Sequence, residues 1–200
     1  MIIDMHMHEM RYSGDSFLRL ENMVKIAKRR GLDGICITDH DSMGLKEFAA
    51  EYSEKTGFPI FVGIEFYSLQ GDIVAFGIED YPKERIPAQE FVDLVQAQGG
   101  MCFSAHPFRN NNRGLEENLK IVKGLDGIEV LNGSTLYEAN RKAAEYAAEL
   151  GLATVGSSDC HVPEKLGLYA TYFPREIRSV QELIRSVKRC ETLPVYYKEG

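Results

Sequence analysis

Five histidines restrict what this chain can fold into more than any other feature, because each of them follows a short apolar run. His6 and His8 follow the apolar start of the chain, which predicts a buried strand over residues 2–7. Side chains alternate faces along a strand, so these two imidazoles are expected on the same side, roughly 7 Å apart at Cα. The other three histidines end later apolar runs and are His40, His106 and His161. Histidines placed in this way indicate metal ligands more than scattered surface or core residues.

Segments with helical and strand periodicity alternate along the chain, and short loops join them. The spacing of apolar residues predicts a helix over about 17–30, for example, and another at about 115–123. Only a short turn around Gly71 separates two apolar runs, which predicts a hairpin there. The residues after a last helix at about 179–189 are expected to be loosely held. This alternation specifies an α/β fold with a mainly parallel sheet.

The polar residues of interest fall at the carboxyl ends of their predicted strands, where both (β/α) barrels and open α/β sheets keep their active sites. Candidates come from at least five strands. An open sheet gathers residues mainly at one switch point, so convergence of that many strand ends favours a barrel.

Composition limits the class of protein. The chain has 200 residues, 44% hydrophobic and 26% charged, without an internal repeat or a linker, so residues 1–200 are expected to form one globular domain. The net charge of −7 argues against an extended nucleic-acid surface. No apolar stretch approaches the length of a membrane span, no signal peptide is seen, and the four cysteines show no C-x-x-C spacing. We therefore predict a cytoplasmic protein without a membrane partner; the oligomeric state is left open.

Carboxylates accompany the histidines at the predicted strand ends. The complete set of candidate metal ligands is His6, His8, Asp15, His40, Glu65, His106, Asp159 and His161. One zinc ion takes about four ligands, so this set suits two or three divalent ions, with Glu65 as a natural bridge. Ions about 3.5–4 Å apart can hold the attacking and leaving oxygens of a phosphoryl displacement.

Seven short motifs carry these donors in a fixed order along nearly the whole chain. They are Asp4-Met5-His6-Met7-His8, Tyr12-Ser13-Gly14-Asp15-Ser16, Thr38-Asp39-His40-Asp41, Gly63-Ile64-Glu65, Ala105-His106-Pro107, the segment 127–133, and Ser158-Asp159-Cys160-His161. The combination resembles the PHP (polymerase and histidinol phosphatase) family. The resemblance implies a distorted (β/α)7 barrel, similar to a TIM barrel, with a di- or trinuclear site of zinc, iron or manganese that hydrolyses phosphate esters.

The resemblance also implies how the ligands are divided among the ions. His6, His8, Glu65 and Asp159 would hold one ion, Glu65 and His106 a second, and Asp15, His40 and His161 a third.

Three positions depart from the family pattern. Many members carry a histidine where this chain has Asp72, which is interpreted as either an oxygen ligand or a loop cap. The spacing from His8 to Asp15 is about one residue longer than usual, and a helix N-cap is the alternative role for this carboxylate. Cys160 stands where a small residue is common, and it is interpreted as a buried neighbour of the site.

Other polar residues near these motifs have two interpretations each. Asp39 is expected to orient a neighbouring histidine or a water, or to accept a proton. Arg109 can grip a phosphate through two guanidinium nitrogens, or it is a solvent-facing loop residue. Asn132 either contacts substrate or ends its strand, and Glu129 is expected to be structural. The predicted catalytic residues are therefore Asp39, Asp159 and Arg109, and the predicted substrate contacts are Arg109 and Asn132.

The function predicted from these residues is hydrolysis of a phosphate ester, either a monoester or a diester, of a small phosphorylated metabolite or nucleotide. One alternative is an amidohydrolase-type enzyme that hydrolyses a carbon–nitrogen bond. A metal-binding lysine at a strand end would favour that alternative, and no lysine stands at one. A non-catalytic metal-binding domain is the other alternative, although structural zinc sites close with four ligands.

Overall fold

The computed structural model describes residues 1–196, so the last four residues of the predicted domain lie outside the described residues. The helices of the described chain are α1 (Leu20–Arg29), α2 (Lys46–Thr56), α3 (Ala88–Ala97), the 3-10 helix η1 (Glu116–Lys120), α4 (Tyr137–Leu150) and α5 (Val180–Lys188). Its strands are β1 (Ile2–Asp4), β2 (Gly34–Ile37), β3 (Ile60–Val62), β4 (Ile64–Tyr67), β5 (Asp72–Phe76), β6 (Met101–Ser104), β7 (Gly127–Asn132), β8 (Ala153–Ser157), β9 (Tyr169–Tyr172) and β10 (Leu193–Tyr196).

The strands form two five-stranded sheets, with the orders β10-β9-β1-β2-β3 and β4-β5-β6-β7-β8. In the first sheet β1, β2 and β3 are parallel. β9 pairs antiparallel with β1, and β10 pairs antiparallel with β9. In the second sheet β6, β7 and β8 are parallel, whereas β4 and β5 form an antiparallel hairpin next to them. The hairpin predicted around Gly71 is thus confirmed, with Tyr67 opposite Asp72.

The mixed α/β class is confirmed, but the predicted (β/α)7 barrel is not shown. The strands within residues 1–196 form two sheets and no closed barrel. The physical reason lies between β3 and β4, which are separated by Gly63 alone, without the helix of a parallel crossover. A Cβ on Gly63 would overlap the carbonyl oxygen of Ala75, so the glycine lets the chain bend close to β5 as it passes from one sheet to the other.

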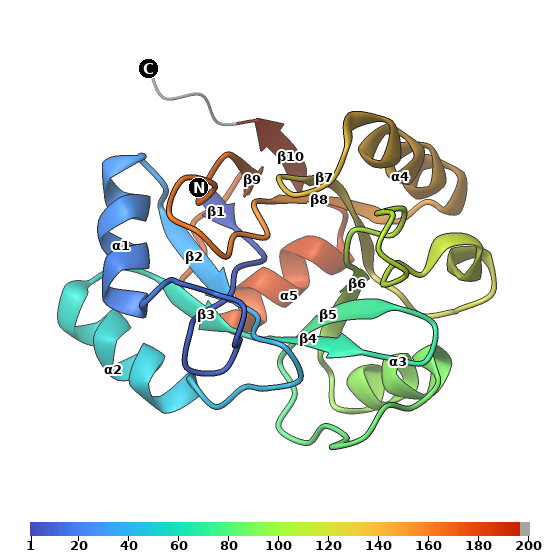
Figure 1. The fold of residues 1–200 in the computed structure, drawn as a ribbon, viewed down its shortest axis with the longest axis horizontal. Helices are drawn as coiled ribbons and strands as arrows, with labels where there is room; N and C mark the ends of the chain where they lie inside the picture. The colour runs from blue at the N-terminus through green and yellow to red at the C-terminus, as the bar shows by residue number, and fades with distance from the viewer. Residues whose placement is uncertain (197–200) are drawn as a thin grey trace.

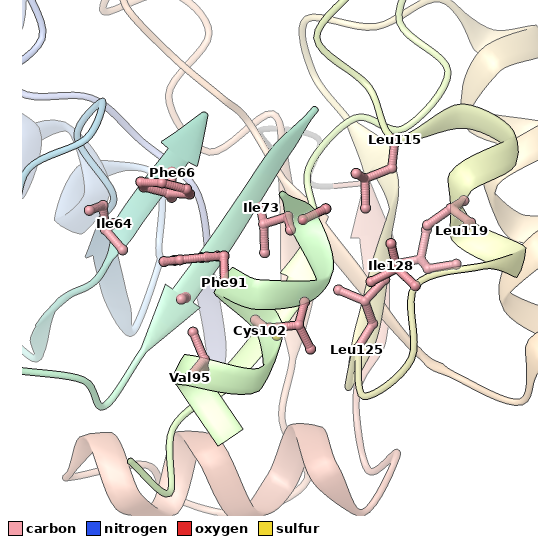
Figure 2. Close-up of a cluster of buried hydrophobic side chains, with 14 of the residues drawn as sticks. Ile64, Phe66, Ile73, Phe91, Val95, Cys102, Leu115, Leu119, Leu125 and Ile128 are labelled. Atoms are coloured by element: carbon pink, nitrogen blue, oxygen red, sulfur yellow. The ribbon is translucent and has the colours of Figure 1, made fainter. Parts of the chain in front are cut away.

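Helices cover the outer face of each sheet, and α5 lies between the sheets in the centre of the view (Figure 1). In α1 the buried residues recur at helical spacing, and Met23 packs with Ile35 of β2. On the second sheet Phe91 of α3 stacks on Phe66 of β4 with ring centroids 4.1 Å apart (Figure 2). Leu183 of α5 is buried among residues of both sheets. This packing leaves the carboxyl ends of the central strands free to carry polar side chains.

Two local predictions are wrong. The segment expected to be a helix at about 115–123 is only the short 3-10 helix η1, whose first residue, Glu116, has a positive φ of 50°. The segment after α5 was expected to be loosely held, but Leu193–Tyr196 within it pairs with β9 as an antiparallel strand. Residues 197–200 lie outside the described residues. None of the helices in the described part of the chain has the length and apolar content that crossing a bilayer requires.

Candidate metal centre

All eight predicted ligands meet where the carboxyl ends of the strands of both sheets come together. The donors form three sets, and within each set the donor atoms lie no more than 4.8 Å apart. The sets are His6 with His8 and Asp159, His8 with His40 and His161, and Glu65 with Asp72 and His106. Asp15 joins the second set, since its Oδ2 lies 3.3 Å from Nε2 of both His40 and His161. Their role as ligands is not tested by these distances, but the convergence that it requires is present.

Two isolated bridges between the sheets place most of these side chains. Met7 pairs in parallel with Cys160, so His6 and His8 flank one side of the bridge and Asp159 and His161 flank the other. Because side chains alternate along extended backbone, His6 and His8 point toward the same side, where His8 meets Asp159 at 3.2 Å and stacks on the ring of His161. Burial raises the pKa of the Cys160 thiol well above its usual value, which is consistent with a protonated neighbour of the site. The second bridge joins His40 directly to Glu65.

Strained backbone marks the same end of the strands. Positive φ angles occur at three non-glycine residues here, 49° at Asp41, 27° at His106 and 48° at Asp159. L-residues rarely adopt this region, and each such residue costs about 1–3 kcal/mol. Strain of this kind persists where the surrounding structure holds a side chain in place for a function.

His6 is oriented by a buried carboxylate that the sequence analysis assigned only a structural role. Nδ1 of His6 lies 3.3 Å from Oε1 of Glu129 and donates to it, because an ionised carboxylate can only accept. Nε2 of His6 therefore faces the other ligands. The signal in the sequence was a carboxylate inside the apolar run of β7, where an unpaired charge is costly.

His8 is oriented by a hydroxyl. Ser13 Oγ donates to Oδ1 of Asp39 over 2.8 Å, so it accepts a hydrogen bond from the N–H at Nδ1 of His8 over 3.2 Å. Asp39 also accepts a hydrogen bond of 2.6 Å from the backbone N–H of Glu9. Asp39 therefore orients the ring of His8 indirectly, through the hydroxyl of Ser13. The predicted catalytic role of Asp39 is untested.

The unprotonated Nε2 of His8 lies close to a carboxylate oxygen and to a second imidazole. It lies 3.2 Å from Oδ1 of Asp159 and 3.0 Å from Nε2 of His6. Burial lowers the pKa of His8 to about 4, so at neutral pH His8 places no proton between its Nε2 and Oδ1 of Asp159. Metal–ligand bonds of about 2.0–2.2 Å place two ligands of one ion about 3 Å apart. The donor set therefore fits a shared divalent cation.

Glu65 contacts four of the five histidines. Oε1 lies 3.2 Å from Nε2 of His6 and 3.0 Å from Nε2 of His106. Oε2 lies 3.7 Å from Nε2 of His8 and 2.7 Å from Nδ1 of His40. The last pair has no hydrogen-bond geometry, although the nitrogen of His40 is buried. A carboxylate that faces four imidazoles can bridge two ions, which agrees with the role expected for it.

The electrostatic field of this centre favours positive charge. Burial by itself would lower the pKa of His6, but Asp159, Glu65 and Glu129 raise it well above its usual value. Burial would raise the pKa of Glu65 and of Asp159, yet the adjacent histidines lower both well below the usual range. Without a bound cation, protons on imidazoles offset the carboxylates, and divalent ions would release these protons.

Arg109 lies at the edge of the centre and is held by three oxygens. Its Nε donates to Oγ1 of Thr135 over 3.0 Å, and its Nη2 donates to Oδ1 of Asn132 over 2.6 Å and to Oδ2 of Asp159. Asn132 in turn donates from Nδ2 to Asp159 over 3.2 Å and to Glu129 over 2.9 Å. Asn132 thus lies at the site as predicted, where its amide fixes the orientation of Arg109.

Arg113 forms a second pair with a carboxylate beside the centre. Nε of Arg113 lies 2.6 Å from Oδ2 of Asp72, and Nη2 lies 2.9 Å from Oδ1. Asp72 is fully buried, and its Oδ2 is 3.7 Å from Nε2 of His106. Asp72 is therefore not a simple loop cap, and both of its carboxylate oxygens accept hydrogen bonds from Arg113.

Replacing Glu129 by glutamine is expected to weaken metal binding by about 10–100-fold, the usual effect of losing a residue that orients a ligand. The Glu129 oxygens accept from Nδ1 of His6, the N–H of His106, Nδ2 of Asn132 and Oγ of Ser157, so the NH2 of a glutamine would face donors. Competition with a chromogenic chelator measures the affinity. Glu138→Gln on the exposed face of α4 is the matched control. An affinity of Glu129→Gln equal to that of the control would contradict this role.

A cavity of about 680 Å³ opens elsewhere, between α2, β3 and the start of α5. Its lining mixes apolar residues with polar and charged ones, among them Arg178 and the ion pair of Lys46 with Glu79, and it contains none of the candidate metal ligands. The candidate metal centre is therefore identified by its donor geometry and not by the size of an opening.

Comparison with known proteins agrees with the resemblance found in the motifs. A family model described as PHP-associated matches residues 137–192. An uncharacterized protein from Methanocaldococcus jannaschii is 29% identical over 140 residues, which cover 64% of this chain and 80% of the relative. A protein named "Probable phosphatase" from Caldicellulosiruptor saccharolyticus is 24% identical over 208 residues, which cover 99% of this chain and 78% of the relative.

Several solved structures share the fold. A Bifidobacterium adolescentis protein assigned as a metal-dependent phosphoesterase has a TM-score of 0.72 and 19% identity, over 94% of this chain and 96% of that one. An amidohydrolase from Chromobacterium violaceum, solved with sulfate and no metal, has a TM-score of 0.70 and 20% identity over 98% of both chains. A lesion-specific endonuclease from Pyrococcus furiosus has a TM-score of 0.73 and 17% identity, over 94% of this chain and 56% of that one.

At these identities the solved structures establish the fold. The family model over residues 137–192 and the sequence relatives agree with the motifs and with the arrangement of the donors. The resemblance of this chain to the PHP-type, metal-dependent phosphoesterase-like proteins, expected from the sequence, is confirmed.

Proposed function

We propose that this protein hydrolyses a phosphate ester, a monoester or a diester, of a small phosphorylated metabolite or nucleotide. One observation carries the proposal. At the candidate metal centre the unprotonated Nε2 of His8 lies 3.2 Å from Oδ1 of Asp159, and the guanidinium of Arg109 lies beside the same carboxylate. A phosphatase, a phosphoesterase and an endonuclease among the similar proteins support it.

The ligand sets proposed from the resemblance fit the donors that lie together. His6, His8, Glu65 and Asp159 would hold one ion, and Asp15, His40 and His161, close to Glu65, would hold another. The resemblance also implies a third ion at Glu65 and His106. When bound, zinc, manganese or iron ions would lower the pKa of a water and offset the negative charge of the phosphoryl oxygens.

The two arginines are the groups of this chain suited to the phosphate itself. Nε and Nη2 of Arg109 are held by the protein, which leaves Nη1 without a hydrogen-bond partner within residues 1–196. A guanidinium fixed along one edge can donate its other edge to a phosphoryl oxygen without first ordering a side chain. Asp159, whose Oδ2 accepts from this guanidinium, would hold an ion and orient the attacking water through Oδ1.

Replacing Arg109 by methionine is expected to lower kcat/KM for a phosphate ester by ~100-fold, about 2.7 kcal/mol of transition-state stabilisation. The reason is that methionine keeps much of the length of the side chain but has no positive charge for the phosphate oxygens. Steady-state kinetics of Arg109→Met and of Arg109→Lys, with metal content measured on each, checks this. Arg141→Met, which removes an exposed guanidinium paired with Glu138 and Glu145, is the control. An Arg109→Met enzyme with the kcat/KM of the control would exclude a phosphate contact.

Hydrolysis of a carbon–nitrogen bond is the alternative activity, because an amidohydrolase shares the fold. The residues favour the phosphoester. The donor sets consist of histidines and carboxylates, and the nearest cations are guanidiniums, which match the geometry of phosphate.

One assay panel tests the proposed function. The full chain, loaded with manganese or zinc, is tested on p-nitrophenyl phosphate, bis-p-nitrophenyl phosphate, histidinol phosphate, nucleotides and a p-nitroanilide amide. Metal-dependent release of p-nitrophenol or phosphate is expected, and it should be lost in His6→Ala and kept in Arg141→Met. Metal-loaded protein that hydrolyses none of the phosphate esters would overturn the proposal, and turnover of the anilide alone would favour the amidohydrolase activity.

The remaining expectations concern the setting in which the enzyme works. We propose a cytoplasmic location, which is supported by four cysteines that form no disulfide. The proposed partner is the small phosphorylated substrate, without an extended nucleic-acid surface.

A further inference from the structure

The Glu65, Asp72 and His106 set differs from the other two donor sets in one respect. Its middle member, Asp72, is already bonded to a cation, because Arg113 donates to Oδ2 over 2.6 Å and to Oδ1 over 2.9 Å. A bidentate guanidinium engages both oxygens of a carboxylate and offsets its charge, so it competes with a metal ion for that carboxylate. Without Asp72, this set offers an incoming ion only Glu65 and His106.

The guanidinium is held in this position from several sides. Its carbon lies 4.4 Å from the centroid of the Tyr67 ring, and the backbone N–H of Asp72 donates to the carbonyl of Arg113 over 2.6 Å. Gly71 allows this close approach of the loop to the start of β5. Gly71 has a φ of 153°, and a Cβ there would lie 2.6 Å from the carbonyl carbon of Gly114. The backbone itself is shaped to bring Arg113 to Asp72.

The guanidinium also lies against the bridging carboxylate. Nη2 of Arg113 is 4.0 Å from Oε2 of Glu65, and His106 keeps its Nε2 3.0 Å from Oε1 of the same side chain. An arginine stays protonated at every accessible pH. A divalent ion held by Glu65 and His106 would therefore meet a fixed positive charge where a third ligand is required.

We propose that Arg113 takes the place of a metal ion at Glu65, Asp72 and His106, so that the chain binds two divalent ions and uses a guanidinium as its third cation. The inference rests on the proposed function only in requiring that the other two sets bind metal. His106 is then a positioning residue, which donates from Nε2 to Glu65 and fixes the carboxylate that faces both ions. Nε and Nη2 of Arg113 are engaged by Asp72, and Nη1, without a hydrogen-bond partner among the described residues, is directed to an anionic substrate.

Metal counting tests the inference directly. The full chain is saturated with Mn²⁺ or Zn²⁺, desalted, and analysed by inductively coupled plasma mass spectrometry against protein concentration. About two equivalents are expected for the wild type and for Asp72→Asn, since Asp72 is not a ligand. Arg113→Met is expected to gain a third equivalent, because it frees the carboxylate and removes the opposing charge. Arg113→Met combined with Asp72→Asn should return to two, and Arg141→Met is the control for loss of a surface guanidinium.

Three equivalents on the wild type, a lower count for Asp72→Asn, or an unchanged count for Arg113→Met would each overturn the inference. If Arg113→Met does not fold, as judged by circular dichroism, the wild-type and Asp72→Asn counts decide the question. The metal count is independent of turnover. A chain with two ions and no phosphoesterase activity would contradict the proposed function alone, and an active chain with three ions would contradict this inference alone.

Discussion

A Glu65→Gln variant is expected to lose phosphoesterase activity by about 10³-fold or more in kcat/KM, which is about 4 kcal/mol of transition-state stabilisation. Glu65 is the side chain that faces most of the centre, with oxygens 2.7–3.7 Å from nitrogens of His6, His8, His40 and His106. Glutamine has nearly the same shape but removes the charge that offsets the ions. It also places an NH2 group, which cannot bind a metal, toward the histidines.

The measurement combines steady-state kinetics with metal analysis of the same preparation. Glu138→Gln, which neutralises an exposed carboxylate on α4, should keep both activity and metal content. Glu65→Gln is expected to retain fewer ions than the control. Full metal content with full activity in Glu65→Gln would show that the carboxylate does not bridge ions, and the proposed arrangement of the ligands would then be wrong.

Removal of the metals is expected to abolish activity and to destabilise the fold. The apo centre buries Glu65, Glu129 and Asp159 against imidazoles, whereas bound ions would offset these charges directly. An ion present at about 100 times its Kd stabilises the folded state by about 2.7 kcal/mol. One kcal/mol shifts the Tm of a chain of this size by about 2–4 °C, so a Tm about 5–10 °C lower is expected after chelation of one such ion.

Differential scanning fluorimetry and activity assays, before and after dialysis against a chelator, check both effects. Adding back Mn²⁺ or Zn²⁺ should restore the Tm and the turnover together. The matched control is His6→Ala, whose Tm should respond less to chelation because a ligand is already missing. A wild-type protein that keeps its Tm and its turnover after complete metal removal would rule out a metal-dependent mechanism.

The strand-end histidines show how far periodicity alone can lead. Apolar runs that end in polar residues predict where strands stop, and parallel strands carry their carboxyl ends at one edge. The convergence of His6, His8, His106 and His161 can therefore be expected from residue spacing. The roles of Ser13 and Glu129 cannot, because each depends on which side chain from a distant strand lies next to it. Glu129 reaches His6 across 123 residues of sequence, and no local spacing reports such a contact.

The arginines show the same limit on a loop. Arg109 was predicted as a phosphate contact because it closely follows a strand-end histidine, and its place beside Asp159 is compatible with that prediction. The pairing of Arg113 with Asp72 depends instead on the approach of Gly71 to Gly114, which places the loop against the start of β5. Loop conformation is set by tertiary contacts more than by local propensity, so the sequence left the role of Asp72 open.

The sequence by itself predicted the kind of site, since imidazoles and carboxylates at several strand ends are the ligands that zinc, manganese and iron bind in proteins. It also determined the alternation of strands and helices and the hairpin at Gly71. The tertiary structure alone decided that the strands form two sheets, joined at the bridges Met7–Cys160 and His40–Glu65; the barrel expected from the convergence of strand ends is not shown. It also decided which carboxylates are paired with an arginine. The physical reason is that residue spacing fixes local geometry, whereas the pairing of one charged side chain with another depends on packing across the whole chain.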